Sequence, residues 1–187
     1  HVEAHSLRIS ILECIYQLVV KGESEDSAEN APRKGAESLA SLINVLFERI
    51  LDTNSFVRTK TLSLLSSLCT EGRMNAGMVD ALWNASADRL KDKASNVRRR
   101  ALIVLSEILK KHPFSFDGGQ LNLQTFRCRL AQCEEAIEKA NEAQLDTLLV
   151  QKKYYNDACK FGEKVKQVLV FVTNSFLYCQ NKTEVNE

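Results

Sequence analysis

The chain has 187 residues, of which 26% are charged and 44% are hydrophobic, which is the composition of a soluble globular protein. Its 25 Lys and Arg nearly balance its 24 Asp and Glu, so a net charge of +1 excludes a global field that would draw the whole molecule onto nucleic acid or an anionic membrane. Seven Gly and two Pro are few for the turns of an all-β or Rossmann-like protein, so an all-helical fold is favoured.

The first predicted element is a helix over residues 1–20, followed by an acidic loop. The apolar side chains of the helix have the three-and-four spacing of an amphipathic helix. These side chains are Leu7, Ile11, Ile15 and Leu18. Residues 21–38 are rich in acids and lack large apolar side chains, so they bury nothing that would offset the entropy of ordering them. The sequence therefore predicts a flexible loop there.

Two helix pairs are predicted over residues 39–112. In each pair two amphipathic helices flank a short polar turn, DTNS in the first pair and KDKAS in the second. Trp83 belongs to the apolar pattern of its helix and is expected in the core. Pro113 ends the second pair, and residues 113–120 are expected to form a loop.

A long antiparallel helical hairpin is predicted over residues 121–180. Its first helix is expected to run to about residue 149 and its second to start at about residue 152, because apolar residues recur at helical spacing in both segments. Tyr154 and Tyr155 fall on the apolar stripe of the second helix and are expected in its core. Residues 181–187 have capping-box spacing and are expected to begin a further helix, so we expect the chain to be a fragment of a longer protein.

The most specific signal in the sequence is an internal repeat. Residues 51–68 align without gaps on residues 91–108, which gives a period of 40 residues. Helical pairs that repeat every ~40–47 residues are typical of HEAT solenoids, in which stacked neighbours share one continuous core. The predicted fold is an all-α, HEAT-repeat solenoid fragment with a long C-terminal helical hairpin.

The repeat also predicts a structural ladder of aspartates and arginines. Asp52 precedes Arg58 by six positions, as Asp92 precedes Arg98. We expect each arginine to reach the aspartate of a neighbouring turn in a largely desolvated setting. The first helix joins the pattern through Leu7, Arg8, Leu12 and Ile15, although the acidic loop increases the spacing between Arg8 and Arg58 to 50 residues.

Three segments carry a resemblance to a known family. They are DTNSFVRTKTL at 52–62, DRLKDKASNVRRRALIVLSEILKKHPF at 88–114 and QKKYYNDACKFGEKV at 151–165. In this order they resemble the condensin complex subunit 1 family, the non-SMC HEAT-repeat subunit of condensin. The resemblance implies a non-catalytic subunit of a chromosome-organising ATPase complex, which contacts DNA, the kleisin subunit and an SMC ATPase subunit. It also implies a role in mitotic chromosome condensation in the nucleus and on chromosomes, with a cytoplasmic pool.

A second interpretation is a HEAT-type scaffold, such as a transport or phosphatase adaptor, that binds peptides and not DNA. The feature that favours DNA is a cluster over residues 88–111, where eight cations outweigh three acids. Such a cluster can meet the phosphates of a duplex without reading its bases. Six of its side chains form the predicted basic ridge: Lys91, Lys93, Arg99, Arg100, Lys110 and Lys111. For these residues a solvated helix face and a contact with a protein partner stay open as alternatives.

No catalytic, metal or cofactor site is predicted. The sequence shows no nucleophile beside a base, no phosphate-binding loop and no CxxC motif among its six cysteines. Cys128 and Cys133 lie five residues apart on a predicted helix and are expected to be core thiols and not a metal or redox pair. His112, at a predicted helix end, is expected to cap carbonyls. No apolar run approaches the ~18 residues of a membrane span.

Overall fold

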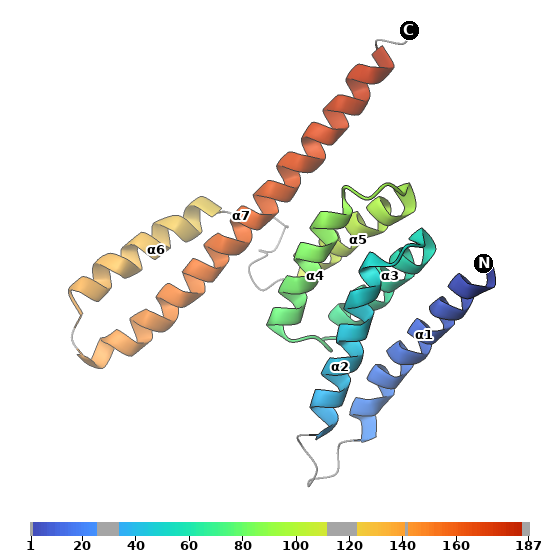
Figure 1. Ribbon diagram of the computed structural model, residues 1–187. Coiled ribbons are helices and arrows are strands. Elements are labelled where there is room, and N and C mark those ends of the chain that lie inside the picture. Colours follow the sequence, from blue (N-terminus) through green and yellow to red (C-terminus); the bar gives the residue numbers. More distant parts are fainter. Residues whose placement is uncertain (1, 26–33, 112–122, 141, 185–187) are drawn as a thin grey trace. The chain divides into compact units, whose positions relative to one another are not determined.

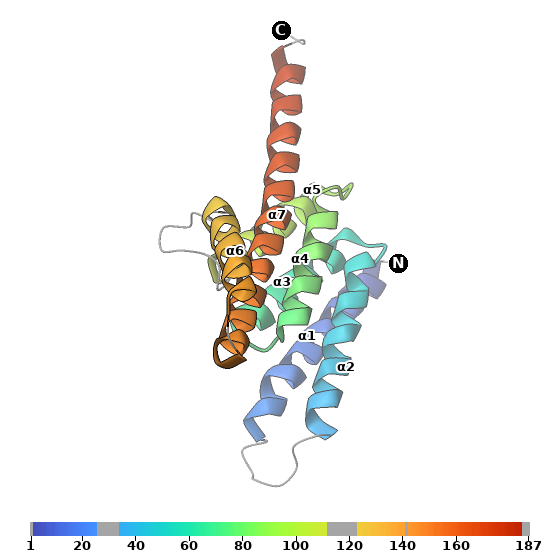
Figure 2. The same ribbon diagram turned by 90° about the vertical axis from the view of Figure 1, so that its left-hand side faces the viewer.

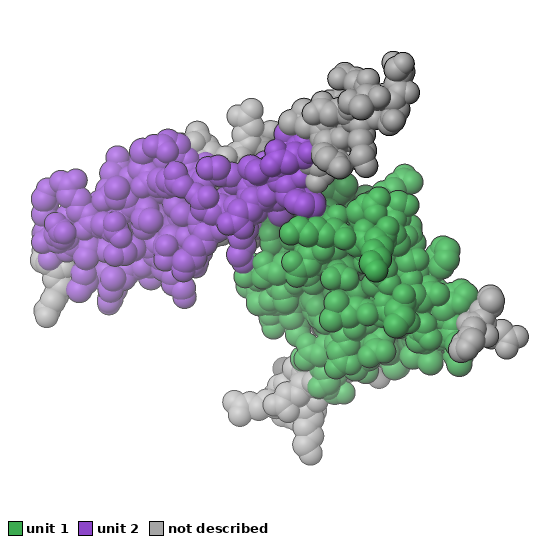
Figure 3. All heavy atoms as spheres, turned by 45° about the horizontal axis from the view of Figure 1, so that its top comes forward, with its two compact units in different colours: residues 1–112 green, residues 113–187 purple. Residues whose placement is uncertain are grey.

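The computed structural model describes residues 2–25, 34–111, 123–140 and 142–184, and these ranges consist of helices and the turns between them. The chain divides into two compact units, residues 1–112 and residues 113–187 (Figure 3). Unit 1 contains the repeats, and unit 2 contains the helical hairpin.

Unit 1 is a HEAT-like α-solenoid (Figure 1). Its described elements are α1 (Val2–Glu25), α2 (Lys34–Glu48), the 3-10 helix η1 (Arg49–Leu51), α3 (Ser55–Thr70), α4 (Ala76–Arg89) and α5 (Ser95–Lys111). One repeat pairs α2 and η1 with α3, and the next pairs α4 with α5. The second helices of successive repeats pack on one another, α1 on α3 and α3 on α5. This is the stacking that the 40-residue period predicts.

The turns of unit 1 follow from local side-chain chemistry. The side chain of Asn54 accepts a hydrogen bond of 2.8 Å from the backbone N–H of Phe56, and so caps α3. Asn75 caps α4 in the same way, with 2.9 Å to the N–H of Met78. Gly72 ends α3 with a φ of 75°, a left-handed conformation that glycine adopts without a steric penalty.

The core of unit 1 lies between the paired helices and is built from branched aliphatic side chains. Residues of four helices and both repeats contribute to it: Leu46, Leu62, Leu65, Leu68, Leu82, Val97 and Val104 are fully buried. Trp83 is 3% exposed and belongs to this core, as its position in the pattern predicts. Burying one such side chain stabilises the fold by about 1.5 to 3 kcal/mol.

The first loop is shorter than the sequence indicates. α1 continues through Glu25 and α2 begins at Lys34, so both helices extend into the stretch 21–38. Glu, Ala and Lys are good helix formers, and the lack of apolar side chains therefore does not by itself end a helix. The middle of the predicted flexible loop, residues 26–33, lies outside the described residues, as do the predicted loop 113–120 and His112.

The predicted apolar face of α1 is wrong. Leu7, Ile11 and Leu18 are 63%, 50% and 57% exposed, whereas Leu12 and Val19 are buried. α1 carries apolar residues around much of its circumference, so spacing alone does not select the face that packs. Two polar contacts hold the helix on α3: Lys60 pairs with Glu13, and the Tyr16 hydroxyl donates to Glu71 Oε1 at 2.6 Å. This hydrogen bond, with burial and the Glu71 charge, raises the pKa of Tyr16.

Unit 2 is an antiparallel hairpin of α6 (Leu123–Glu138) and α7 (Glu142–Glu184) (Figures 1 and 2). α6 ends at Glu138, about ten residues earlier than predicted, because the Lys-Ala-Asn sequence that follows contains no Gly or Pro to mark the end of the helix. α7 runs without a break to Glu184, so the predicted new helix at 181–187 is wrong over its described part. The capping-box spacing there falls inside a continuous helix.

The core of the hairpin is smaller than the apolar pattern of α7 indicates. Phe126 and Cys133 of α6 are buried, and so are Ala158, Phe161 and Val165 of α7. Tyr154, expected in the core, is 46% exposed, and Tyr155 is half-buried. A single helix partner covers only one side of α7, which leaves the flanks of its apolar stripe in solvent. Among the described helices, none is both long and apolar enough to cross a membrane.

Candidate functional site

The two repeat turns of unit 1 lie along the same edge of the solenoid. Turn 52–54 joins η1 to α3, and turn 90–94 joins α4 to α5, both at the end where α1 begins (Figures 1 and 2). Each turn is built on an aspartate. Asp52 Oδ1 accepts the N–H of Asn54 at 2.9 Å, and Asp92 Oδ1 accepts the N–H of Ala94 at 3.0 Å. These bonds fix the carboxylates in position at the starts of α3 and α5.

The arginine of one repeat binds the aspartate of the next, and we call each such pair a rung. Arg58 donates from Nε to Asp92 Oδ2 at 2.9 Å and from Nη2 to Oδ1 at 2.7 Å. Its Nη1 donates to the backbone carbonyls of Asp52 and Thr53 at 2.7 and 3.0 Å. The side chains of Arg58 and Asp92 are 12% and 3% exposed. One guanidinium therefore ties its own turn to the turn of the following repeat.

An earlier rung joins α1 to the first turn. Arg8 Nη2 lies 3.2 Å from Asp52 Oδ1, and its Nε lies 3.1 Å from Oδ2. Arg8 is more exposed than Arg58, at 36% of its side chain, while Asp52 is 5% exposed. The rungs Arg8–Asp52 and Arg58–Asp92 both pair an arginine with a turn aspartate, but only Arg58 makes two hydrogen bonds to its carboxylate, since Arg8 donates through Nη2 alone.

Asp92 is held in its ionised form. Burial on its own raises the pKa of Asp92, but the hydrogen bonds from Arg58 and Ala94 and the charges of Arg58 and Arg89 outweigh burial, so that its pKa lies below the ordinary value. Arg89 Nη1 adds a second, longer contact of 3.5 Å to Oδ2. The 40-residue period places Arg49 at the equivalent position, but Arg49 pairs with Glu48, so the repeat alone does not predict this contact of Arg89.

Arg98 does not pair with a turn aspartate. Its Nη1 donates to the carbonyls of Asp92 and Lys93 at 2.9 and 3.0 Å, which is how Arg58 is held on its own turn. The Asp92 carboxylate is occupied by Arg58, and within the described ranges no other carboxylate forms an ion pair with Arg98. Arg98 is exposed, so the expectation that it is desolvated is wrong.

The sequence contains a signal that Arg98 has no aspartate at the spacing that Arg58 uses. Arg58 reaches the aspartate 34 positions further along the chain, and the position 34 residues after Arg98 is Gln132, which lies in the hairpin. The ladder therefore has no following rung at that spacing.

The basic ridge does not form one surface. Lys91 and Lys93 are exposed in turn 90–94, and Arg99 is exposed on the first turn of α5. Lys110 and Lys111 end α5, and the eleven residues after Arg99 place Lys110 about 16 Å away along the helix axis. Lys111 Nζ donates to the carbonyl of Thr70 at the end of α3.

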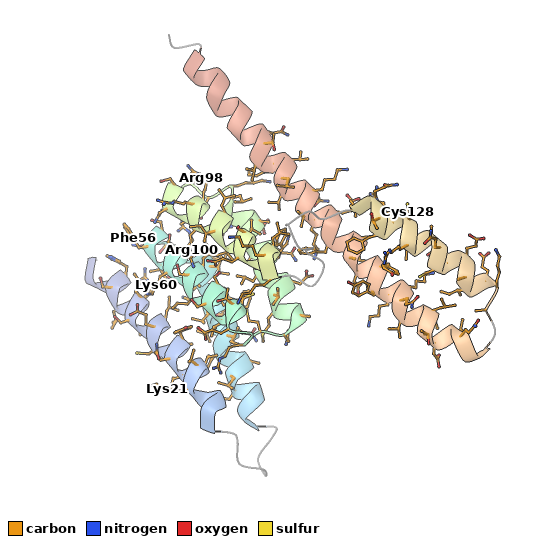
Figure 4. The ribbon with its side chains drawn as sticks, turned by 180° about the vertical axis from the view of Figure 1, so that it is seen from behind. Lys21, Phe56, Lys60, Arg98, Arg100 and Cys128 are labelled. Carbon is orange, nitrogen blue, oxygen red and sulfur yellow. The ribbon has the colours of Figure 1, made fainter. Side chains whose placement is uncertain are left out.

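Arg100 is not one of the exposed cations of the first turn of α5. Figure 4 labels Arg98 and Arg100 on α5 and Lys60 on α3. Arg100 is half-buried, and its Nε is buried without a hydrogen-bond partner in the described part of the chain. We therefore define the turn edge as the four exposed cations of turn 90–94 and the first turn of α5. They are Lys91, Lys93, Arg98 and Arg99.

A hollow in the surface lies beside the turn edge. It is lined by both turns and by the Arg58–Asp92 rung, and Lys91 and Lys93 form part of its wall. Its polar lining carries charges of both signs and contains no cysteine, serine or histidine. In unit 2 a shallow groove between α6 and α7 is lined by Arg129, Cys133 and Tyr155, among others.

The described cysteines and the side chains that could bind a metal do not gather into a site. Cys133 is buried and Cys128 is exposed, so the two face different surroundings. Burial raises the pKa of the Cys69 and Cys159 thiols, which keeps them protonated and poorly nucleophilic. Among the residues whose placement is known, no three His, Cys, Asp or Glu side chains gather as a metal site would require.

Comparison with known proteins places these repeats in a family. The model of the family described as sister chromatid cohesion protein PDS5 matches residues 3–158, which includes both rungs and the turn edge. The chain belongs to this family.

Several condensin subunits are similar to this family member. It is 31% identical to condensin complex subunit 1 of Saccharomyces cerevisiae over 146 residues, which are 77% of the chain and 11% of that protein. It is 25% identical to condensin-1 complex subunit CAP-D2 of Arabidopsis thaliana over 138 residues, which are 73% of the chain and 10% of that protein. The resemblance to condensin complex subunit 1 is thus confirmed, and the chain spans about a tenth of the length of these relatives.

Proposed function

We propose that this chain is part of a non-catalytic HEAT-repeat subunit of a condensin complex, and that its turn edge binds the backbone of duplex DNA. The support is the family membership, the similarity to condensin complex subunit 1, and the four exposed cations on one end of the solenoid. The subunit binds the SMC ATPase and kleisin subunits of condensin and acts in mitotic chromosome condensation. It works in the nucleus and on chromosomes, with a cytoplasmic pool.

The single observation that carries DNA binding is the clustering of cations at the turn edge. Asp92 is neutralised by Arg58 and Arg89 and does not offset the cations around it, so Asp88, which lines the same hollow as Lys91 and Lys93, is the exposed acid beside them. Backbone phosphates attract such a cluster whatever the base sequence, and binding releases counterions. We therefore expect binding that depends strongly on salt and weakly on sequence.

The test is duplex binding by the 187-residue chain at salt concentrations between about 50 and 200 mM, measured by fluorescence anisotropy. Replacing Lys91, Lys93 and Arg99 together by Ala should weaken binding to all sequences alike. The slope of log affinity against log salt should fall by about 0.9 for each phosphate that the variant no longer neutralises. None of the three side chains is buried, so the helical content should stay the same.

The matched control replaces Lys110 and Lys111 by Ala, which removes two charges from the far end of the same helix. We expect a smaller loss of affinity and of slope, because these charges lie apart from the turn edge. An unchanged slope in the triple variant, or no duplex binding at about 50 mM salt, would contradict DNA binding at this edge. The second outcome would favour a peptide-binding HEAT scaffold.

A further inference from the structure

The end of the ladder leaves a guanidinium that is held in place and has no carboxylate to bind among the described residues. Arg98 is anchored through Nη1 on the carbonyls of its own turn, at 2.9 and 3.0 Å, as Arg58 is at 2.7 and 3.0 Å. In Arg58 the opposite edge, Nε and Nη2, grips both oxygens of Asp92. Arg98 is exposed, and in the described structure neither its Nε nor its Nη2 forms a hydrogen bond or ion pair.

This edge is a preorganised site for an oxyanion. A guanidinium presents two parallel N–H donors that match two oxygens of a carboxylate or a phosphate. Because Nη1 is already fixed, binding at the other edge orders little additional side-chain freedom. The Arg58 rung shows that this geometry holds an anion in the same fold, with contacts of 2.7 and 2.9 Å to Asp92.

The residues around Arg98 select the kind of anion. The 40-residue repeat pairs Leu51 with Lys91, Thr53 with Lys93, and Thr59 with Arg99. Around Arg58, where the bound anion is one carboxylate, all three positions are uncharged. Around Arg98 all three are cations. A single carboxylate would match Arg98 alone, whereas the row of phosphates on a duplex offers further anions to the cations beside it.

We propose that Arg98 binds a backbone phosphate of duplex DNA through the Nε–Nη2 edge of its guanidinium, in the place where the preceding repeats hold an aspartate. The inference rests on the proposed function and makes it more specific. Arg98 binds one phosphate through two hydrogen bonds. Lys91, Lys93 and Arg99 attract the neighbouring phosphates as point charges. Arg98 thereby sets the position of the duplex on the turn edge.

The test separates geometry from charge in the 187-residue chain. Arg98→Lys keeps the positive charge and removes the fork, and Arg99→Lys is the matched control one residue away. With a duplex of about 20 base pairs at about 50 mM salt, R98K should bind about five- to tenfold more weakly than the unchanged chain. R99K should bind within about twofold. Thermal unfolding of both variants checks that the fold is retained.

A second readout follows Arg98 itself. Its Nε–H signal in a nitrogen-15 NMR spectrum is assigned by its absence in R98K. Addition of duplex should shift this signal and slow its exchange with water, whereas poly-glutamate at equal charge concentration should do so less. R98K that binds as well as R99K, or a signal that moves with poly-glutamate and not with duplex, would overturn the phosphate site and leave DNA binding at the turn edge intact. No duplex binding by the unchanged chain would overturn the proposed function and this inference together.

Discussion

Two arginines with the same sequence context have different environments in this protein. Arg58 and Arg98 both follow an aspartate by six residues, and both donate from Nη1 to the carbonyls of their own turn. Arg58 is 12% exposed and binds Asp92, whereas Arg98 is exposed and binds no carboxylate of the described residues. The difference arises because a further repeat turn packs against Arg58.

Because their environments differ, we expect the replacement of these two arginines by alanine to lower the free energy of unfolding by different amounts. Arg58→Ala should lower the free energy of unfolding by about 2 to 4 kcal/mol, because it leaves the buried Asp92 charge with only the 3.5 Å contact to Arg89 and the N–H of Ala94. Arg98→Ala, the matched variant one repeat later, should cost less than about 1 kcal/mol, since it exposes two carbonyls that water can solvate. Urea denaturation of both variants measures the difference. Equal losses would show that Arg98 is buried against a carboxylate after all.

The Arg58–Asp92 rung should also make stability depend on pH. The folded state holds the pKa of Asp92 below its ordinary value, so protonation favours the unfolded chain. The contribution of the rung is complete above the unfolded pKa, about 3.9, and is lost as the pH falls through the lower folded pKa. The gap in unfolding free energy between the unchanged chain and Asp92→Asn should therefore be larger at about pH 7 than in strong acid.

Denaturation of both proteins at each pH isolates this residue, because all other carboxylates titrate in both. A gap of the same size at the two pH values would contradict the role assigned to Asp92.

At the scale of elements, α3 and α5 bury the same set of repeat positions, whereas α1 exposes that set. Val57, Thr61, Leu64 and Leu68 of α3 are buried, as are Val97, Ala101, Val104 and Ile108 of α5. The equivalent positions of α1 are exposed: Leu7, Ile11, Cys14 and Leu18. α3 is contacted by the first helix of its repeat and by α1 and α5, and α5 is contacted by α4 and α3. In α1, no helix of the described chain covers it.

Matched leucines on α1 test this assignment of faces. Leu12 is 2% exposed and Leu18 is 57% exposed. Leu12→Ala should cost about 2 to 4 kcal/mol, because it leaves a cavity between α1 and its neighbours. Leu18→Ala should cost within about 0.5 kcal/mol, since alanine is the better helix former and little burial is removed. A larger cost for Leu18 than for Leu12 would reverse the faces.

The hairpin differs from the repeats in how its two helices are held together. Phe126 and Cys133 of α6 and Phe161 and Val165 of α7 are buried, and ion pairs flank them. Lys152 pairs with Glu134 at 3.1 Å, and Arg127 pairs with Glu163. These ionised side chains are between 40% and 51% exposed, so each pair contributes little to stability, about 0 to 1 kcal/mol. Apolar burial therefore carries most of the stability of the hairpin.

At the scale of the whole molecule, the family match crosses both units. It covers residues 3–158, which takes in unit 1 and the hairpin as far as the middle of α7. The repeat signal and the turn edge lie in unit 1 alone. The chain spans about a tenth of the length of its condensin relatives.

The sequence by itself determined the helical class, the repeat and the family. The 40-residue period places Asp52, Arg58, Asp92 and Arg98 in register without any structure, because a repeated packing unit requires the same residue types at the same positions. Most helix limits in unit 1 also follow from local signals, such as the polar turn before Ser55 and the one before Ser95.

Only the tertiary structure decided which faces are buried and which charges are paired. Leu7 and Leu12 are equally apolar, and Arg58 and Arg98 are equally basic, but burial and pairing depend on which neighbour packs against each. The turn of the hairpin needed the structure as well, because Lys139 to Asn141 lacks the residues that break a helix. The physical reason is the same in each case: local propensity acts within a few residues, whereas desolvation and ion pairing join residues tens of positions apart in the chain.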